Sequence, residues 1–134
     1  MVYLWFSLLN NQKTKVYYKL LNKVFEDIKY SNEEKNFLED GIDEIWDTWK
    51  DNFKVDNKII EKVLKWLEKV VENRVAAIME GNYRKSYYKA ALLVVGYGEI
   101  LESQELENKE EYINYYIAKY PRRSAFRAEL KELM

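Results

Sequence analysis

Apolar residues recur every three to four positions along most of the chain, which is the spacing of one face of an α-helix. In residues 14–30 this stripe consists of Val16, Leu20, Val24 and Ile28. The same periodicity predicts further helices over residues 31–53, 56–80, 83–103, 108–120 and 124–133. Residues 2–9 are mostly apolar, a pattern that suits either a helix or a strand. We therefore expect an all-α protein with five to six helices.

The ends of the predicted helices carry residues that favour helix boundaries. Asp56 or Asn57 can cap the longest helix, and Gly81 favours its end. Asn108 can cap the helix that follows it. Ser31 and Glu34 together have the form of a capping box. The breaks are short, so neighbouring helices should lie antiparallel, either in a compact bundle or in a short solenoid-like array of helical hairpins. A chain of 134 residues is expected to form a single domain.

The composition excludes several classes of function. The chain has no cysteine and no histidine, so it lacks disulfides, thiolate ligands and the commonest general base. We expect a protein that is not an enzyme and binds no metal and no cofactor. Residues 2–9 are too short for a membrane span, which takes ~20 residues, and they lack the basic residues that precede a signal-peptide core. We expect this segment to dock on the core or, alternatively, to form a dimer contact, in a cytoplasmic protein without membrane contact.

Residues 31–51 are strongly acidic, with eight carboxylates and two lysines. At ~100° per residue, the acids and the aromatic residues Trp46, Trp49 and Phe53 fall on opposite sides of a helix. This pattern predicts that the carboxylates face solvent and the aromatic residues face the core. Carboxylate metal sites in helix bundles use acids that point inward, so no metal site is expected here. Gly41 inside this helix favours close packing against a neighbour.

The helix predicted at residues 83–103 is apolar on all sides between residues 90 and 101. A helix with this pattern is typically buried at the centre of a protein. Gly96 and Gly98 would allow neighbouring helices to approach it closely. We therefore expect this helix to be the centre of the core.

Glu99 lies within that apolar stretch. A buried carboxylate requires a partner or a raised pKa. The expected partner is Arg74, or an arginine of the last helix, in a buried ion pair. The alternative is that Glu99 is a catalytic acid in a site that also contains Tyr97.

Basic residues gather at the start of the same helix and at the end of the chain, and tyrosines are interleaved with them. The basic residues are Arg84, Lys85, Lys89, Arg122, Arg123 and Arg127. Arginine beside tyrosine suits contact with phosphates and stacking on nucleic-acid bases. The alternative is that these charges only form surface ion pairs, for example with Glu129, while the tyrosines pack in the core.

The C-terminal part of the chain also contains two recognisable patterns. A predicted helix has a tyrosine shortly before two adjacent alanines, and a later segment has basic residues followed by a small residue and then by Glu-Leu. The residues concerned are Tyr88, Ala90, Ala91, Arg122, Arg123, Ala125, Phe126, Glu129 and Leu130. Over residues 83–133 the chain thereby resembles the helical C-terminal tail of SWIM-type zinc-finger proteins. The resemblance implies a helical-hairpin array that serves as an interaction scaffold. The zinc finger of that family requires cysteines and histidine, which this chain lacks, so zinc-dependent binding is not implied.

Three hypotheses on function follow. The first is a non-catalytic helical interaction module that binds a protein partner or a second copy of itself, and it predicts an exposed apolar groove. The second is a small helical subunit that contacts RNA or DNA through the six basic residues, and it predicts that they share one face. The third, ranked last, is an enzyme with a site around Glu99 and Tyr97, which predicts a polar pocket there.

Overall fold

The computed structural model describes residues 2–26, 43–53 and 55–134. Within them the chain forms seven α-helices and one short 3₁₀ helix, with no strand. In chain order these are α1 (Val2–Leu9), α2 (Lys15–Glu26), α3 (Asp43–Asn52), α4 (Asn57–Glu80), η3 (Arg84–Ser86), α5 (Tyr87–Ser103), α6 (Lys109–Lys119) and α7 (Ser124–Leu133). The predicted all-α class is confirmed. The count is seven and not five to six, because the apolar segment at the N-terminal end is itself a helix. None of the helices in the described ranges is both long and apolar enough to cross a bilayer.

Several helix boundaries follow from side chains that cap free backbone N–H groups. The Asp56 carboxylate accepts a hydrogen bond from the backbone N–H of Lys58 at the start of α4. Asn108 accepts from two backbone N–H groups at the start of α6, as its position before that helix predicts. At the other end of α4 the chain turns at Asn82, whose positive φ of 55° asparagine tolerates better than most residues. Residues 27–42, with the proposed capping box and Gly41, lie outside the described residues.

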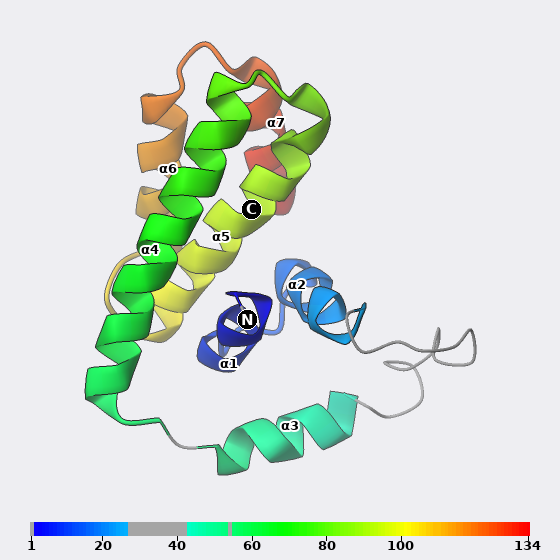
Figure 1. The fold of residues 1–134 in the computed structure, drawn as a ribbon, viewed down its shortest axis with the longest axis vertical. Coiled ribbons are helices and arrows are strands. Elements are labelled where there is room, and N and C mark those ends of the chain that lie inside the picture. Colours follow the sequence, from blue (N-terminus) through cyan, green and yellow to red (C-terminus); the bar gives the residue numbers. More distant parts are fainter. Residues whose placement is uncertain (1, 27–42, 54) are drawn as a thin grey trace.

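Helix α5 forms the centre of the core (Figure 1) and contacts α1, α2, α4, α6 and α7. Residues 90–101 are all buried, which confirms the prediction made from their apolarity. Gly96 permits a close approach: a Cβ atom built there would lie 2.6 Å from a methyl carbon of Leu20 and 3.0 Å from the ring of Phe6. The absence of a side chain at residue 96 therefore lets α1 and α2 pack directly on α5.

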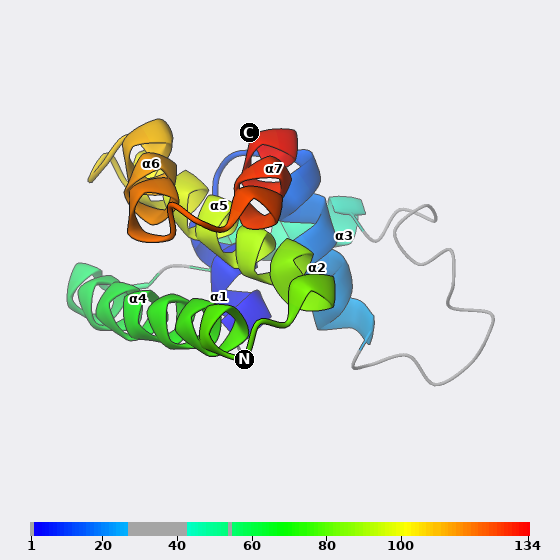
Figure 2. The same cartoon turned by 90° about the horizontal axis from the view of Figure 1, so that it is seen from above.

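The helices around α5 run in two directions. Helices α4, α6 and α7 extend along α5, whereas α1 and α2 run across it (Figures 1 and 2). One hydrophobic core includes residues from all six of these helices. The arrangement is a compact cluster centred on α5, in which the consecutive helices α4 and α5 lie along each other and the pair α1 and α2 crosses α5.

Helix α3 lies at the edge of the molecule (Figure 1). Trp46 is buried and donates its indole N–H to the hydroxyl of Tyr17 at 2.9 Å. Trp49 and Phe53 stack on each other, with ring centroids 5.1 Å apart. They are 45% and 43% exposed, so the prediction that they face the core is wrong. Helix α3 is held through Trp46 and through Lys50, whose ammonium group donates to the backbone carbonyl of Asn10, whereas Trp49 and Phe53 stay partly exposed beside these contacts.

Candidate functional site

An apolar groove lies where α2, α4 and α5 meet, beside α1, which Figure 2 shows between α4 and α2. Each of the three helices contributes residues three or four positions apart, which therefore lie on one face of that helix. The lining residues are Tyr3 of α1, Leu20 and Lys23 of α2, Arg74, Ala77 and Ile78 of α4, and Lys89, Leu92 and Leu93 of α5. The groove has a volume of about 270 Å³. The three leucines are buried and form its floor.

Positive charge surrounds this apolar floor. Lys23, Arg74 and Lys89, one from each of the three helices, line the groove, and no carboxylate is among the described residues around it. The Lys23 ammonium group lies 5.7 Å from the centre of the Tyr3 ring, a distance at which a cation is attracted to an aromatic face. Arg74 and Lys89 are exposed. The groove therefore suits a ligand with a bulky apolar group next to negative charge.

A second, polar cleft lies between η3 and the turn from α6 to α7. Its volume is about 150 Å³, and its lining includes three of the predicted basic residues, Arg84, Arg122 and Arg123. The backbone N–H groups at the start of α7 face this region without a side-chain cap. Arginines and a helix N-terminus both favour an anion. The structure therefore brings together half of the predicted basic cluster.

The remaining basic residues are divided among other contacts. Lys89 belongs to the apolar groove, and Lys85 is exposed on η3. Arg127 is half-buried and donates to the carbonyl of Pro121 at 2.7 Å. Arg123 itself donates to the carbonyl of Met79 and to the side-chain oxygen of Asn82, both at 3.0 Å, so it also fastens the end of α4. Three of the six basic residues therefore line the polar cleft, and the other three have different surroundings.

Glu99 is buried, at 1% exposure, as its apolar surroundings predict. Its carboxylate accepts hydrogen bonds from the side chains of Asn10 at 3.0 Å and Thr14 at 2.7 Å. The ammonium group of Lys109 lies 3.7 Å away. The predicted pairing with Arg74 is wrong, because Arg74 lies at the level of Leu93, six residues or ~9 Å before Glu99 along α5. Glu99 thus ties the α1–α2 connection to α5 and α6.

Tyr97 also makes a hydrogen bond that joins two helices. Its hydroxyl is buried and donates to the backbone carbonyl of Leu64 at 3.0 Å. Burial raises the pKa of Tyr97 well above the ordinary value for tyrosine. Glu99 and Tyr97 therefore hold helices together through bonds that are already made, and neither lines the groove or the polar cleft. Within the described ranges, no group of three or more acidic side chains is placed to hold a metal ion.

The groove was not recognised from the sequence. Helices α2, α4 and α5 each supply only two or three residues, and α1 supplies one. Within each of the three helices, the set looks like an ordinary apolar stripe with one cation at its edge. No family model, curated protein or solved structure matches the chain. The resemblance of residues 83–133 to the SWIM-type tail stays a prediction, because these comparisons do not test it.

Proposed function

We propose that this protein is a helical interaction module whose groove binds an acidic segment of a partner protein. The partner segment inserts a bulky apolar side chain between α2, α4 and α5, and its carboxylates face Lys23, Arg74 and Lys89. Grooves of this kind accept the apolar face of an amphipathic helix, with anchoring side chains one turn apart. The proposed role is binding without turnover.

The single observation that carries this proposal is the combination of an apolar floor with three cations and no carboxylate in the lining. An apolar floor alone would favour any hydrophobic segment, including a second copy of the chain. The charges make the groove selective, because like charges across an interface are costly and opposite charges also accelerate association. Arginine and tyrosine, both in this lining, are among the residues most often found at the energetic centre of interfaces.

The proposal can be tested by selection from a displayed library of random sixteen-residue peptides on the intact protein. We expect the selected peptides to be acidic and to share a bulky apolar residue. Two variants locate the binding surface. Ala77→Trp fills the groove from an exposed position on α4, and Arg74→Glu/Lys89→Glu reverses its charge. Lys85→Glu/Lys131→Glu makes the same charge change at exposed positions outside the groove and serves as the control.

Both groove variants should bind the selected peptides at least about tenfold more weakly, the usual effect of removing an interface anchor. The control should bind them as the wild type does. Selected peptides without an acidic excess, or equal binding by the Ala77→Trp variant, would contradict the proposal. Sedimentation of the protein alone measures its oligomeric state and identifies the competing outcome. In that outcome a second copy of the chain occupies the groove, and Ala77→Trp causes the dimer to dissociate.

A second candidate function, contact with RNA or DNA, is favoured by the convergence of Arg84, Arg122 and Arg123 on the polar cleft. Because Arg123 also fastens the end of α4, the informative variant is Arg84→Ala/Arg122→Ala. Fluorescence anisotropy with labelled single-stranded and duplex RNA and DNA at two salt concentrations measures the affinity. Salt-dependent binding that is lost in this variant and kept in Lys131→Ala would support the candidate. The absence of binding at low salt would dismiss it.

A further inference from the structure

A third pocket, of opposite charge, lies between α4 and α6 and is independent of the groove. Its volume is about 200 Å³, and it is lined by three glutamates and three tyrosines: Glu68, Glu72, Glu107, Tyr112, Tyr115 and Tyr116. The two α4 glutamates are four residues apart, and the α6 tyrosines are three and four apart, so each set lies on one helix face. We call this the acidic pocket.

The protein's own Lys119 shows which chemistry this region accepts. Its ammonium group lies 3.6 Å from a carboxylate oxygen of Glu72. The same group lies 5.8 Å from the ring centres of both Tyr115 and Tyr116. A carboxylate together with aromatic faces is the usual environment for an organic cation in a protein. Lys119 does not line the pocket itself, so it stands at the edge of a space that has the same character.

The wall of the pocket contains a buried tyrosine, Tyr112, which is 6% exposed. Its hydroxyl interacts with the side chain of Tyr116 but has no hydrogen-bond partner of ordinary geometry. A buried hydroxyl with so weak a partner is costly. Burial raises the pKa of Tyr112 well above the ordinary value, so this wall of the pocket stays neutral.

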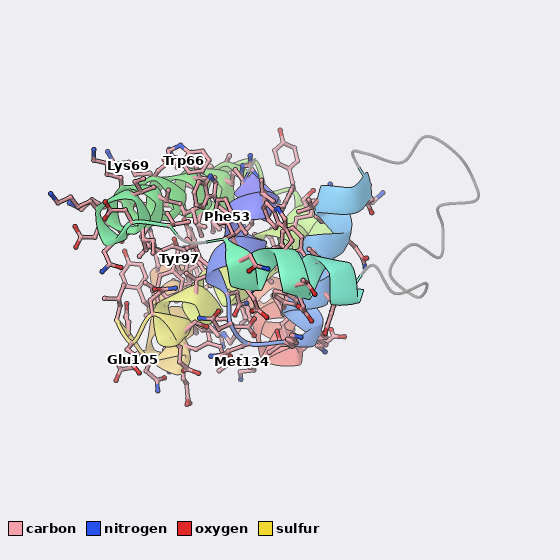
Figure 3. The ribbon with its side chains drawn as sticks, turned by 90° about the horizontal axis from the view of Figure 1, so that it is seen from below. Phe53, Trp66, Lys69, Tyr97, Glu105 and Met134 are labelled. Carbon is pink, nitrogen blue, oxygen red and sulfur yellow. The ribbon has the colours of Figure 1, made fainter. Side chains whose placement is uncertain are left out.

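A further buried tyrosine, Tyr97, lies next to Tyr112 and outside the lining of the pocket. Figure 3 shows Tyr97 between α4, which carries Trp66 and Lys69, and the turn that carries Glu105. The rings of Tyr97 and Tyr112 are 5.2 Å apart. After burial, the charge of Glu68 is among the further influences that raise the pKa of both tyrosines.

We propose that the acidic pocket binds an alkylammonium group, held by Glu68 and Glu107 and by the faces of Tyr115 and Tyr116. Aromatic faces favour an organic cation over a hydrated divalent metal ion, which takes oxygen ligands in a closely spaced set. The described residues contain no acidic cluster of that kind. A free polyamine and a lysine side chain of another protein both carry the group that this pocket recognises.

Isothermal titration calorimetry of the intact protein tests this at constant ionic strength. One arm uses spermidine, a second uses a short peptide with a single lysine, and a third uses magnesium chloride. We expect saturable one-to-one binding of spermidine and none of magnesium. Binding of the peptide as well would identify a lysine side chain as a possible source of the cation, whereas binding of spermidine alone would identify a free polyamine.

Charge variants locate the site. Glu68→Gln/Glu107→Gln should weaken spermidine binding by about tenfold, because two of the carboxylates in the lining are neutralised. Glu26→Gln/Glu132→Gln makes the same change in net charge at exposed positions outside the pocket and should leave the affinity unchanged. All four carboxylates are exposed, so these variants should fold, which circular dichroism verifies.

Two further pairs separate specific binding from general attraction. Tyr115→Leu removes an exposed ring of the pocket and should weaken binding about threefold or more, whereas Tyr88→Leu removes an exposed ring outside it and should not. Lys119→Gln removes the chain's own competing cation and should strengthen binding, while Lys131→Gln should not. The proposal would be overturned if Tyr115→Leu and Tyr88→Leu had equal effects, or if Lys119→Gln and Lys131→Gln did. Equal weakening by the two double Glu→Gln variants would overturn it too, as would binding of magnesium in place of spermidine.

Discussion

The two glycines of α5 provide a matched test of how the core is packed. Both are buried in the same helix, and each substitution by alanine adds one methyl group. At Gly96 the new Cβ would lie 2.6 Å from Leu20 and 3.0 Å from Phe6, both almost fully buried. At Gly98 the nearest atom is 3.2 Å away and belongs to the flexible chain of Lys109. The structure therefore predicts opposite effects of the same substitution.

The magnitudes follow from two opposing contributions. Alanine is favoured over glycine within a helix by about 1 kcal/mol. Forcing an extra methyl group into a well-packed core costs about 1–3 kcal/mol, and two immobile neighbours at residue 96 place the cost in the upper half of that range. Gly96→Ala should therefore lower the free energy of unfolding by about 1–2 kcal/mol. Gly98→Ala requires only a small shift of one side chain, so it should be neutral or stabilising by up to about 1 kcal/mol.

Urea denaturation followed by circular dichroism measures both variants against the wild type. The expected order of stability is Gly98→Ala, wild type, Gly96→Ala, with the two variants about 2 kcal/mol apart. Thermal midpoints should follow the same order, with about 3–4 °C per kcal/mol for a chain of this size. If Gly96→Ala were as stable as Gly98→Ala, then α1 and α2 would not pack on α5 as closely as we describe, and the reasoning would fail.

Three further predictions concern buried polar groups. Tyr112→Phe should be neutral or stabilising by up to about 1 kcal/mol, because it removes a buried hydroxyl without a hydrogen-bond partner of ordinary geometry. Tyr97→Phe should lower the free energy of unfolding by about 1 kcal/mol, because the bond to the Leu64 carbonyl is lost. Urea titration should not give the reverse order. Burial raises the pKa of Tyr116 to about 12, so between pH 10 and 12 the folded state keeps a proton that the unfolded state has released. The contribution of Tyr116 to the free energy of unfolding is intact below pH 10 and should disappear between pH 10 and 12. Thermal midpoints that stay constant over that interval would contradict this prediction. Glu99→Ala should lower the free energy of unfolding by about 3 kcal/mol, because Asn10, Thr14 and Lys109 lose the carboxylate that they contact. A loss below 1 kcal/mol in urea titration would refute the role of Glu99 in holding the helices together.

Elements governed by local rules could be predicted from the sequence. Asp56 and Asn108 act on backbone groups within three residues, and both cap the helices they precede. The end of α6 at Lys119 follows from Pro121, which cannot continue the helix. The burial of α5 follows from apolar residues on all its sides, because a helix without a polar face has no side to turn toward solvent. In each case the cause and its effect lie within one helix.

Features that depend on distant parts of the chain could not be predicted. A helical projection correctly placed Trp46, Trp49 and Phe53 on one face, but it does not reveal whether another element covers that face. Only Trp46 reaches Tyr17, 29 residues earlier in the chain. The partners of Glu99 include Asn10, 89 residues away, so local spacing contained no sign of them.

The candidate sites depend on a division of charge that the near-zero net charge of −1 conceals. Helix α4 illustrates how the division arises. Arg74 follows Glu72 by two residues, or about 200° around the helix, so the two side chains point in nearly opposite directions. One side of α4 accordingly contributes Arg74 to the positive groove, and the other contributes Glu72 to the acidic pocket.

This opposition makes the two proposals controls for each other. Arg74→Glu should weaken the binding of acidic peptides without weakening the binding of spermidine, and Glu68→Gln should weaken the binding of spermidine without weakening that of acidic peptides. An adverse effect of either substitution on both ligands could not come from long-range charge, because a change that repels an anion attracts a cation. Such a result would have to come from disruption of α4 itself, and it would invalidate the assignment of both surfaces.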